Sequence, residues 1–402
     1  MVITSWRAIP HGVASRKELT ILSMPSPSNS AIRRVARSNG GGVPEAATGS
    51  GRTVNEPASQ PRPQQVTWEM ITGNHWRAKS TRRTARSRRE RSQFSTAEAF
   101  HLVEQVAAMH VPLLALTGGD PLLRPDLLPV IEFAASHSVR ASLTLLPTHR
   151  LNPEVIVQLK MSGLMRAGFW VHGSTAALNN AAWAVNGYYP RTLELIGSCH
   201  EVGLPVQINT VLTRRNLHDL EAMTALLTRL DVALWNIFFL VPPNPEELSD
   251  MLTAEEHEQV FARLYRASRV THFQIKTTEG QPYQRYVLQQ RVRESRGCKT
   301  EAELITLGPN GVNESNGHIF ISHDGEVCPS RFLPLSAGNV TTRSLAEVYG
   351  ESPLFQSLRD SSQLKGKCGR CKFRDVCGGS RARAYAMTGD LFAADPACAY
   401  EP

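Results

Sequence analysis

Short apolar runs alternate with stretches of helical periodicity along the chain between residues 64 and 270. The apolar runs are nearly continuous, which is typical of strands buried on both faces of a parallel sheet. Predicted strands cover residues 65–71, 111–117, 139–146, 165–171, 205–212 and 233–241. Predicted helices follow them at residues 97–110, 125–136, 153–161, 191–202, 217–230 and 253–268. This alternation indicates six consecutive βα units.

Six units are too few for a closed eight-fold barrel, so the sequence predicts an α/β fold with a partial (β/α)6 TIM-like barrel over residues 64–270. A doubly wound open sheet is the alternative. In both folds the ligand site lies at the carboxyl ends of the strands. The alternation is predicted to stop near residue 270, and residues 271–402 are expected to form a small cysteine-rich domain of short strands and turns.

The basic charge of the chain is concentrated near its N-terminus. Residues 1–93 hold 16 Lys and Arg against 5 Asp and Glu, whereas the rest of the chain has a net charge of −3. Residues 1–63 are rich in Ser, Pro, Gly, Ala and Arg without periodicity, which predicts a disordered basic extension. The Arg-dense run at 77–91 has no interleaved aromatic residue, which favours a solvated segment over nucleic-acid binding. No apolar run reaches 18 residues, so we expect no membrane span and a cytoplasmic location.

Four of the seven cysteines lie in the last 35 residues. Cys368, Cys371 and Cys377 follow the spacing C-x2-C-x5-C, and Cys398 comes close to the C-terminus. Thiolates at such spacing hold zinc or an iron–sulfur cluster. An odd number of clustered cysteines fits metal binding in a reducing compartment better than a disulfide framework.

The predicted strand at 111–117 ends in the turn Gly118-Gly119-Asp120-Pro121. The glycines let a ligand approach the backbone, and Asp120 is an acceptor for an ammonium or hydroxyl group, although a tight βα turn has the same composition. With the partial barrel and the segment that starts Cys377-Gly-Gly-Ser-Arg-Ala-Arg-Ala-Tyr385, this turn makes residues 64–402 resemble the radical S-adenosylmethionine (SAM) superfamily. The C-terminal part resembles its SPASM/twitch extension, in the branch that contains heme-maturation proteins.

The resemblance implies a set of site residues. Residues that would line the SAM pocket are Gly118, Gly119, Asp120, Pro121 and Asn209. An auxiliary 4Fe-4S cluster would be held by Cys368, Cys371, Cys377 and Cys398, and the upstream Cys298 and Cys328 would hold a second cluster or complete the first. The implied function is that of an oxidoreductase or maturase that acts on a peptide or a tetrapyrrole-like small molecule, with a reductant protein as partner.

The sequence departs from the family in the loop after the first strand. The family carries C-x3-C-x2-C there for the cluster that cleaves SAM, whereas the matching positions in this chain are Asn74, Ala78 and Thr81. Residues 73–93 around these positions have the Arg-rich composition of a GC-rich gene read in another frame, which indicates a reading-frame shift. Evolved loss of the cysteines is the alternative. His172 stands where the family usually has Asp, and it is either a replacement ligand or base or a plain strand-end residue.

Three functions are therefore open from the sequence. The chain is a radical SAM/SPASM enzyme, a catalytically inactive binding or scaffold protein that retains only the auxiliary iron–sulfur site, or a zinc-stapled α/β protein. The match at Cys377-Gly-Gly-Ser-Arg favours iron over zinc. Because no cysteine precedes Cys199, the sequence as it stands predicts no reductive cleavage of SAM to 5′-deoxyadenosine.

Overall fold

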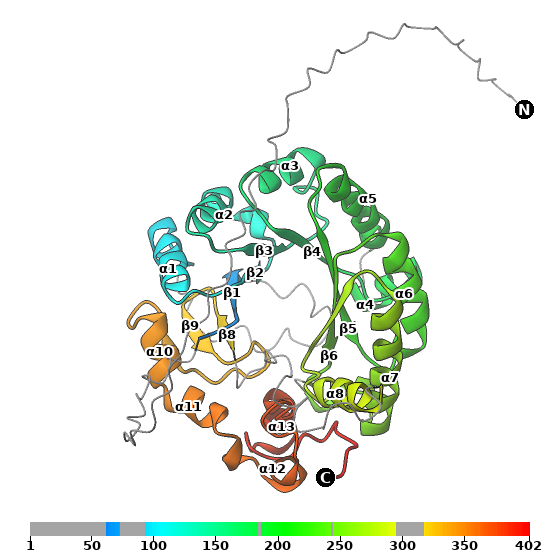
Figure 1. The fold of residues 1–402 in the computed structure, drawn as a ribbon. Helices are drawn as coiled ribbons and strands as arrows, with labels where there is room; N and C mark the ends of the chain where they lie inside the picture. Colours follow the sequence, from blue (N-terminus) through cyan, green and yellow to red (C-terminus); the bar gives the residue numbers. More distant parts are fainter. Residues whose placement is uncertain (1–61, 73–92, 184–185, 243, 295–316) are drawn as a thin grey trace, which may run out of the picture. The chain divides into compact units, whose positions relative to one another are not determined.

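The computed structural model of the protein describes residues 62–72, 93–183, 186–242, 244–294 and 317–402. Their strands form one ten-stranded sheet of order β10-β9-β8-β1-β2-β3-β4-β5-β6-β7. The eight strands from β8 to β7 are parallel, and β9 and β10 add an antiparallel edge. Figure 1 shows the parallel strands as a curved sheet with the long helices on its outer side.

The strands are β1 (Gln65–Ile71), β2 (Leu114–Gly118), β3 (Ala141–Thr144), β4 (Arg166–Trp170), β5 (Val206–Leu212), β6 (Leu234–Phe239), β7 (Gln274–Thr278), β8 (His318–Ile321), β9 (Glu326–Cys328) and β10 (Gly338–Asn339). The helices that follow the parallel strands are α1 (Thr96–Ala108), α2 (Leu127–Ser136), α3 (Pro153–Met161), α4 (Ala176–Trp183), α5 (Tyr188–Glu201), α6 (Leu220–Arg229), α7 (Ala254–Val270) and α8 (Pro282–Glu294). The C-terminal helices are α10 (Leu345–Glu351), α11 (Pro353–Arg359), α12 (Gly366–Arg370) and α13 (Arg381–Thr388).

The sequential strand order confirms the partial barrel. All six predicted strands are present as β1 to β6, and all six predicted helices are present as α1, α2, α3, α5, α6 and α7. A doubly wound sheet reverses its strand order at a switch point, and this sheet does not do so between β1 and β7. The alternative fold is therefore excluded.

The predicted end of the alternation near residue 270 is wrong. Strand β7 pairs in parallel with β6, and α8 follows it, so a seventh βα unit is present. None of the side chains of β7 is fully buried. Its sequence, Gln-Ile-Lys-Thr-Thr, accordingly contains no continuous apolar run. A polar strand of this kind gives no hydrophobic signal in the sequence.

Local sequence signals set the start of α1. The side chain of Ser95 accepts a hydrogen bond from the Glu98 N–H, and the Glu98 carboxylate accepts one from the Ser95 N–H at 2.8 Å. This is the predicted capping box, and it satisfies two of the backbone donors that a helix start leaves open. The helix then buries one apolar face, which includes Leu102 and Val106.

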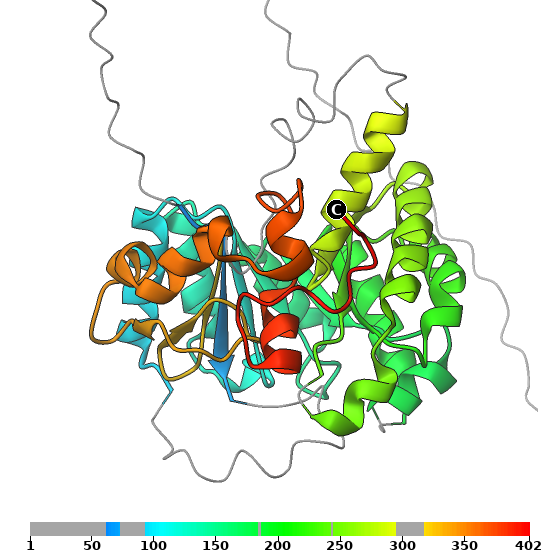
Figure 2. The ribbon, with the colours of Figure 1, turned by 90° about the horizontal axis from the view of Figure 1, so that it is seen from below.

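The C-terminal segment completes the sheet beside β1. Strand β8 runs parallel to β1, with Gln65 opposite His318 and Trp68 opposite Ile321. Trp68 is fully buried, so this side of the sheet belongs to the main hydrophobic core. Helices α11 to α13 lie between the β9 side of the sheet and α8 (Figures 1 and 2). The cysteine-rich segment is thus packed against the barrel.

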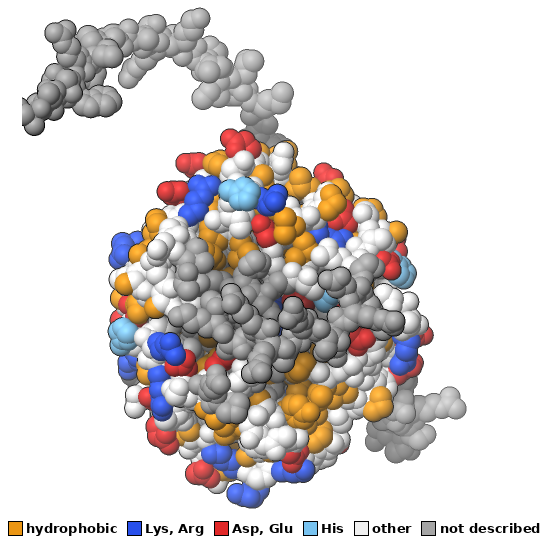
Figure 3. All heavy atoms as spheres, turned by 180° about the vertical axis from the view of Figure 1, so that it is seen from behind, with side chains coloured by type: hydrophobic (Ala, Val, Ile, Leu, Met, Phe, Trp, Pro, Cys, Tyr) orange, Lys and Arg blue, Asp and Glu red, His pale blue; other side chains and the backbone are white. Residues whose placement is uncertain are grey.

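Several sequence-based predictions fall outside the described residues. They are the extension 1–61, the loop with Asn74, Ala78 and Thr81, and Cys298. Within the described part of the chain, no helix is both long and apolar enough to cross a membrane. On the face shown in Figure 3, acidic and basic side chains of the described residues are interspersed.

Candidate functional site

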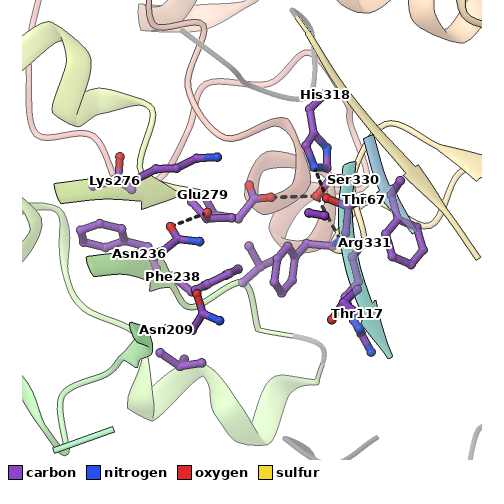
Figure 4. A pocket seen from close by; sticks show the side chains of 18 of the residues that line it. Thr67, Thr117, Asn209, Asn236, Phe238, Lys276, Glu279, His318, Ser330 and Arg331 are labelled. Carbon is purple, nitrogen blue, oxygen red and sulfur yellow. Dashed lines mark hydrogen bonds between the residues drawn. The ribbon is translucent and has the colours of Figure 1, made fainter. Parts of the chain in front are cut away.

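The inner side of the barrel encloses a cavity, and each of the eight parallel strands contributes side chains to its wall. The wall combines aromatic, amide and basic groups, several of which are labelled in Figure 4. The polar members include Gln65, Thr67, Asn209, Asn236, Lys276 and His318. A concave site with apolar walls and a few converging polar groups is the usual form of a small-molecule site.

A directed chain of hydrogen bonds crosses the cavity wall from β7 to β8. Lys276 donates to Gln65 Oε1 at 2.7 Å, and Gln65 donates to Thr67 Oγ1 at 3.0 Å. Thr67 Oγ1 lies 3.1 Å from His318 Nε2, and His318 Nδ1 lies 2.9 Å from the Pro329 carbonyl oxygen. Because a carbonyl only accepts, Nδ1 carries the proton and Nε2 accepts from Thr67. Burial lowers the pKa of His318, which agrees with a neutral ring.

Two cations face this cavity, and their surroundings differ. Burial, reinforced by Arg166, lowers the pKa of Lys276 to about 8. Within the described part of the chain, Lys276 forms no ion pair with a carboxylate, so its charge is available to a ligand. Arg331 instead lies 3.2 Å from a carboxylate oxygen of Glu69. Glu69 also lies 3.7 Å from His323 and raises the pKa of that ring.

The apolar part of the cavity is aromatic. The ring of Trp170 lies 5.0 Å from that of Phe238, and the ring of Phe238 lies 6.2 Å from that of Phe332. These three rings come from β4, β6 and the loop after β9, and all of them line the cavity. Flat rings of this kind bind flat apolar groups by stacking and edge contacts.

Glu279 connects this cavity to the cysteine-rich segment. It follows β7 with a φ of 57°, in the left-handed region that glycine prefers, and it is buried. One carboxylate oxygen accepts from Ser330 Oγ at 2.9 Å and the other from Ser380 Oγ at 2.6 Å. The guanidinium of Arg383 donates to the Glu279 backbone oxygen. These contacts hold the residue in its strained conformation.

The predicted SAM-pocket residues are divided between two places. Asn209 lines the cavity and accepts a hydrogen bond from Gln207 at 2.7 Å. Gly118 and Asp120 lie at the end of β2, outside the lining residues. Asp120 accepts from the Leu122 N–H and from Thr148 Oγ1 at 3.0 Å, so it caps the 3-10 turn Pro121–Leu123. The φ of Gly118 is 128°, and an added Cβ would lie 2.5 Å from the Ile71 oxygen.

His172 is held by the backbone around it. Its Nδ1 accepts from the Val211 N–H at 3.2 Å, and burial lowers the pKa of the ring to about 4. The backbone N–H of His172 donates to Asn179 Oδ1 at 2.7 Å, and Asn179 donates to Gly173 and Thr175. His172 is outside the residues that line the barrel cavity. These contacts give it and Asn179 a role in fixing the loop after β4.

The four C-terminal cysteines surround a second, smaller cavity. Cys368, Cys371, Cys377 and Cys398 all line it. Burial raises the pKa values of Cys371, Cys377 and Cys398. The backbone N–H groups of Phe373, Gly379 and Tyr400 oppose this effect, since each lowers the pKa of the cysteine two residues earlier. The Asp395 N–H lies 3.4 Å from Cys368 Sγ.

This donor set fits an iron–sulfur cluster. The Asp395 N–H donates to Cys368 Sγ, and backbone N–H groups counteract the rise in the pKa values of the other three thiols, so the backbone favours the thiolate form that binds a cluster. Among the residues that the structure describes, no three His, Cys, Asp or Glu side chains converge on a position for a single metal ion. Four thiols around one cavity thus fit a cluster held by thiolates.

The two other cysteines that the structure describes lie apart from this cavity. Cys328 is buried at the end of β9 and is not among the lining residues of either cavity. Cys199 is buried in α5, where burial raises its pKa to about 12, as expected for a core thiol. The cations Arg285, Lys367 and Arg374 also line the cysteine cavity, and the cysteine spacing gave no indication of them.

Comparisons with known proteins agree with this architecture. Residues 75–227 match the model of the Radical SAM superfamily, and residues 313–372 match that of the SPASM iron-sulfur cluster-binding domain. The AdoMet-dependent heme synthase of Methanosarcina barkeri is 31% identical over 340 residues, which cover 85% of this chain and 97% of that protein. The AdoMet-dependent heme synthase of Nitratidesulfovibrio vulgaris is 33% identical over 341 residues, which cover 84% of this chain and 92% of that protein.

The fold also matches solved structures. Streptococcus suis SuiB bound to S-adenosylmethionine superimposes with a TM-score of 0.63 at 13% identity, over 84% of this chain and 78% of that one. Another structure of SuiB contains its precursor peptide SuiA. At this identity the likeness shows the fold, which is the predicted partial barrel.

Proposed function

Since this chain belongs to the radical SAM superfamily and carries its SPASM iron–sulfur domain, we propose that it is a maturase for a tetrapyrrole-like substrate that bears carboxylates. The observation that carries the proposal is the combination of aromatic walls and the cation Lys276 in one barrel cavity. The similarity to two heme synthases over most of the chain supports the same substrate class.

Each part of the cavity has a role in this proposal. Phe238 and Phe332 contact the flat face of the substrate and exclude water from it. Lys276 pairs with a substrate carboxylate, because the amide of Gln65 positions its ammonium group without neutralising it. Asn236 provides an amide group that orients the substrate.

The cysteine cavity is proposed as the site of the auxiliary cluster. Cys368, Cys371, Cys377 and Cys398 would bind one iron each, and the cluster would supply one-electron redox chemistry. Cys328 and Cys298 are proposed to hold a second cluster or to complete the first, with Cys298 outside the described residues. Gly118, Gly119, Asp120, Pro121 and Asn209 are likewise proposed as the residues that line the SAM pocket.

The sequence lacks the usual ligands of the SAM-cleaving cluster. Its three thiolates have no counterpart in the sequence, since Cys199 is the first cysteine of the chain. Asn, Ala and Thr do not replace thiolates as iron ligands. The residues at these three positions therefore do not fit that cluster. The comparisons give no support to the alternative of an inactive scaffold, so activity is decided by experiment.

Substrate binding tests the proposal directly. The full chain is titrated with an iron porphyrin that has free propionates and, separately, with the ester of the same porphyrin. We expect tight binding of the free acid, weak binding of the ester and loss of this preference in Lys276→Met. Equal binding of acid and ester, or preferential binding of an unstructured peptide, would contradict the proposed substrate class.

A second experiment tests SAM cleavage. The reduced native chain is expected to form no 5′-deoxyadenosine from SAM. A triple variant, Asn74→Cys with Ala78→Cys and Thr81→Cys, restores the family spacing and is expected to gain this activity after cluster reconstitution. Formation of 5′-deoxyadenosine by the native chain would show that other residues hold the catalytic iron.

A further inference from the structure

Arg285 is a buried cation on the wall of the cysteine cavity. It lies on α8 and is 3% exposed. Its two terminal nitrogens are engaged, since one donates to Gln289 Oε1 at 2.7 Å and the other to the carboxylate of Glu258. Its Nε is buried and has no hydrogen-bond partner among the described residues. A buried donor without a partner is costly, so its presence beside four thiols requires a reason.

The side chain is also fixed from the other side. The Cζ atom of Arg285 lies 5.1 Å from the ring centre of Tyr400, in a cation–π contact. Tyr400 lines the same cavity, and its backbone N–H acts to lower the pKa of Cys398. The guanidinium is therefore held against the cysteine cavity by contacts on both sides, rather than extended into solvent.

We propose that Arg285 sets the reduction potential of the cluster held by Cys368, Cys371, Cys377 and Cys398. Four thiolates make this cluster anionic, and reduction adds one electron from a low-potential donor without forming or breaking a bond. A fixed positive charge beside the cavity stabilises the reduced form more than the oxidised form. Arg285 is thus a positioning and tuning residue and not a ligand.

The cations that line the cysteine cavity differ in their exposure to water, and Arg285 is the buried one. Two other cations line the cavity wall. Lys367 is partly exposed and lies 3.4 Å from a carboxylate oxygen of the exposed Glu401, and Arg374 is exposed and lies 3.9 Å from a carboxylate oxygen of Asp375. Arg285 is far better shielded from water, so its charge acts through a medium of lower dielectric constant. Its partner Glu258 belongs to α7 and is not among the residues that line the cysteine cavity.

The inference rests on the proposed cluster site, and the experiment separates the two. Iron and sulfide are first measured in the anaerobically reconstituted native chain. Absence of iron there would refute the cluster site itself. With iron present, the midpoint potential of the cluster is measured by redox titration followed by electron paramagnetic resonance, in the native chain and in Arg285→Gln, Arg285→Lys and Glu258→Gln.

The three variants are expected to differ in their effect on the midpoint potential. In Arg285→Gln the equilibrium constant for reduction is expected to fall about tenfold, which is about 59 mV for one electron. Arg285→Lys keeps the charge and is expected to stay close to the native potential. Glu258→Gln breaks the same ion pair from the other side and is expected to leave the potential unchanged or raise it.

An unchanged potential in Arg285→Gln with full iron content would overturn the inference. Lysine and glutamine variants that shift the potential equally would do the same, since the charge would then be irrelevant. If Arg285→Gln takes up no iron, retention of iron by Arg285→Lys and Glu258→Gln supports the charge, and loss of iron from all three refutes it.

Discussion

Glu279 and Ser380 are joined by a hydrogen bond of 2.6 Å between the carboxylate and the hydroxyl group, although 101 residues separate them in sequence. Glu279 lines the barrel cavity, and Ser380 comes three residues after Cys377 at the start of α13. One buried carboxylate therefore contacts both the substrate cavity of the barrel and the segment that carries the cysteines.

Replacing this carboxylate is expected to loosen the contact between the two parts. In Glu279→Gln only one side-chain oxygen remains to accept from Ser330 and Ser380, so one buried hydroxyl loses its acceptor. The free energy of unfolding in urea should fall by about 1–3 kcal/mol. The matched substitution Glu201→Gln, at an exposed position of α5, should leave it unchanged. Equal stability of the two variants would contradict the role of Glu279.

Iron content should depend on the four cysteines around the small cavity. Cys371→Ser is expected to abolish most of the iron bound by this cluster, about four atoms per chain in the native protein. Cys199→Ser is the matched control, because Cys199 is a core thiol in α5 and should leave the iron content intact. Iron and acid-labile sulfide analysis measures both. Equal iron in the native chain and in Cys371→Ser would exclude this residue as a ligand.

Binding of a carboxylate ligand should weaken as the pH rises through about 8. Burial lowers the pKa of Lys276 to about 8, so its ammonium group is charged below this pH and neutral above it. The unfolded chain keeps the ordinary lysine pKa and binds more protons between these values, so the same shift makes the fold more stable as the pH rises across this window. A binding titration from pH 6 to 10 should show the step in the native chain and none in Lys276→Met.

Gly118 should be intolerant of any side chain. Its φ of 128° disfavours other residues, and an added Cβ would lie 2.5 Å from the Ile71 oxygen. We expect Gly118→Ala to lower the thermal midpoint markedly. Gly197→Ala, on the exposed side of α5 where a Cβ meets nothing within 4 Å, should stabilise the protein by about 0.5–1 kcal/mol. A calorimetric scan compares them, and similar midpoints would argue against the backbone constraint.

The parallel strands were predictable where both faces are covered. Leu234–Phe239 is apolar except for Asn236, and all of its residues but Phe238 are buried, so its sequence and its burial agree. Gln274–Thr278 was missed because Lys276, Thr277 and Thr278 line the barrel cavity and the strand carries no hydrophobic period. Ala176–Trp183 was missed as well, because Asn179 and Asn180 interrupt its apolar positions.

Some residues of the candidate site were likewise predictable from the sequence, and others were not. The cysteine spacing brought Cys368, Cys371 and Cys377 together with Cys398, because close spacing restricts how far apart thiols can lie. Arg285 and Glu279 reach the site from the β7–α8 region, and no local pattern distinguishes them from surface charges. Tertiary contacts alone place them there.

The pairing of β1 with β8 has a consequence for biosynthesis. The Thr67–His318 contact spans 251 residues, so this part of the sheet has a high contact order. During translation β1 keeps an unpaired edge until β8 has left the ribosome, and unpaired edges invite association with other chains. The four cysteines follow β8 in the chain, so the edge of β1 is covered before the cysteine-rich segment can fold against the barrel.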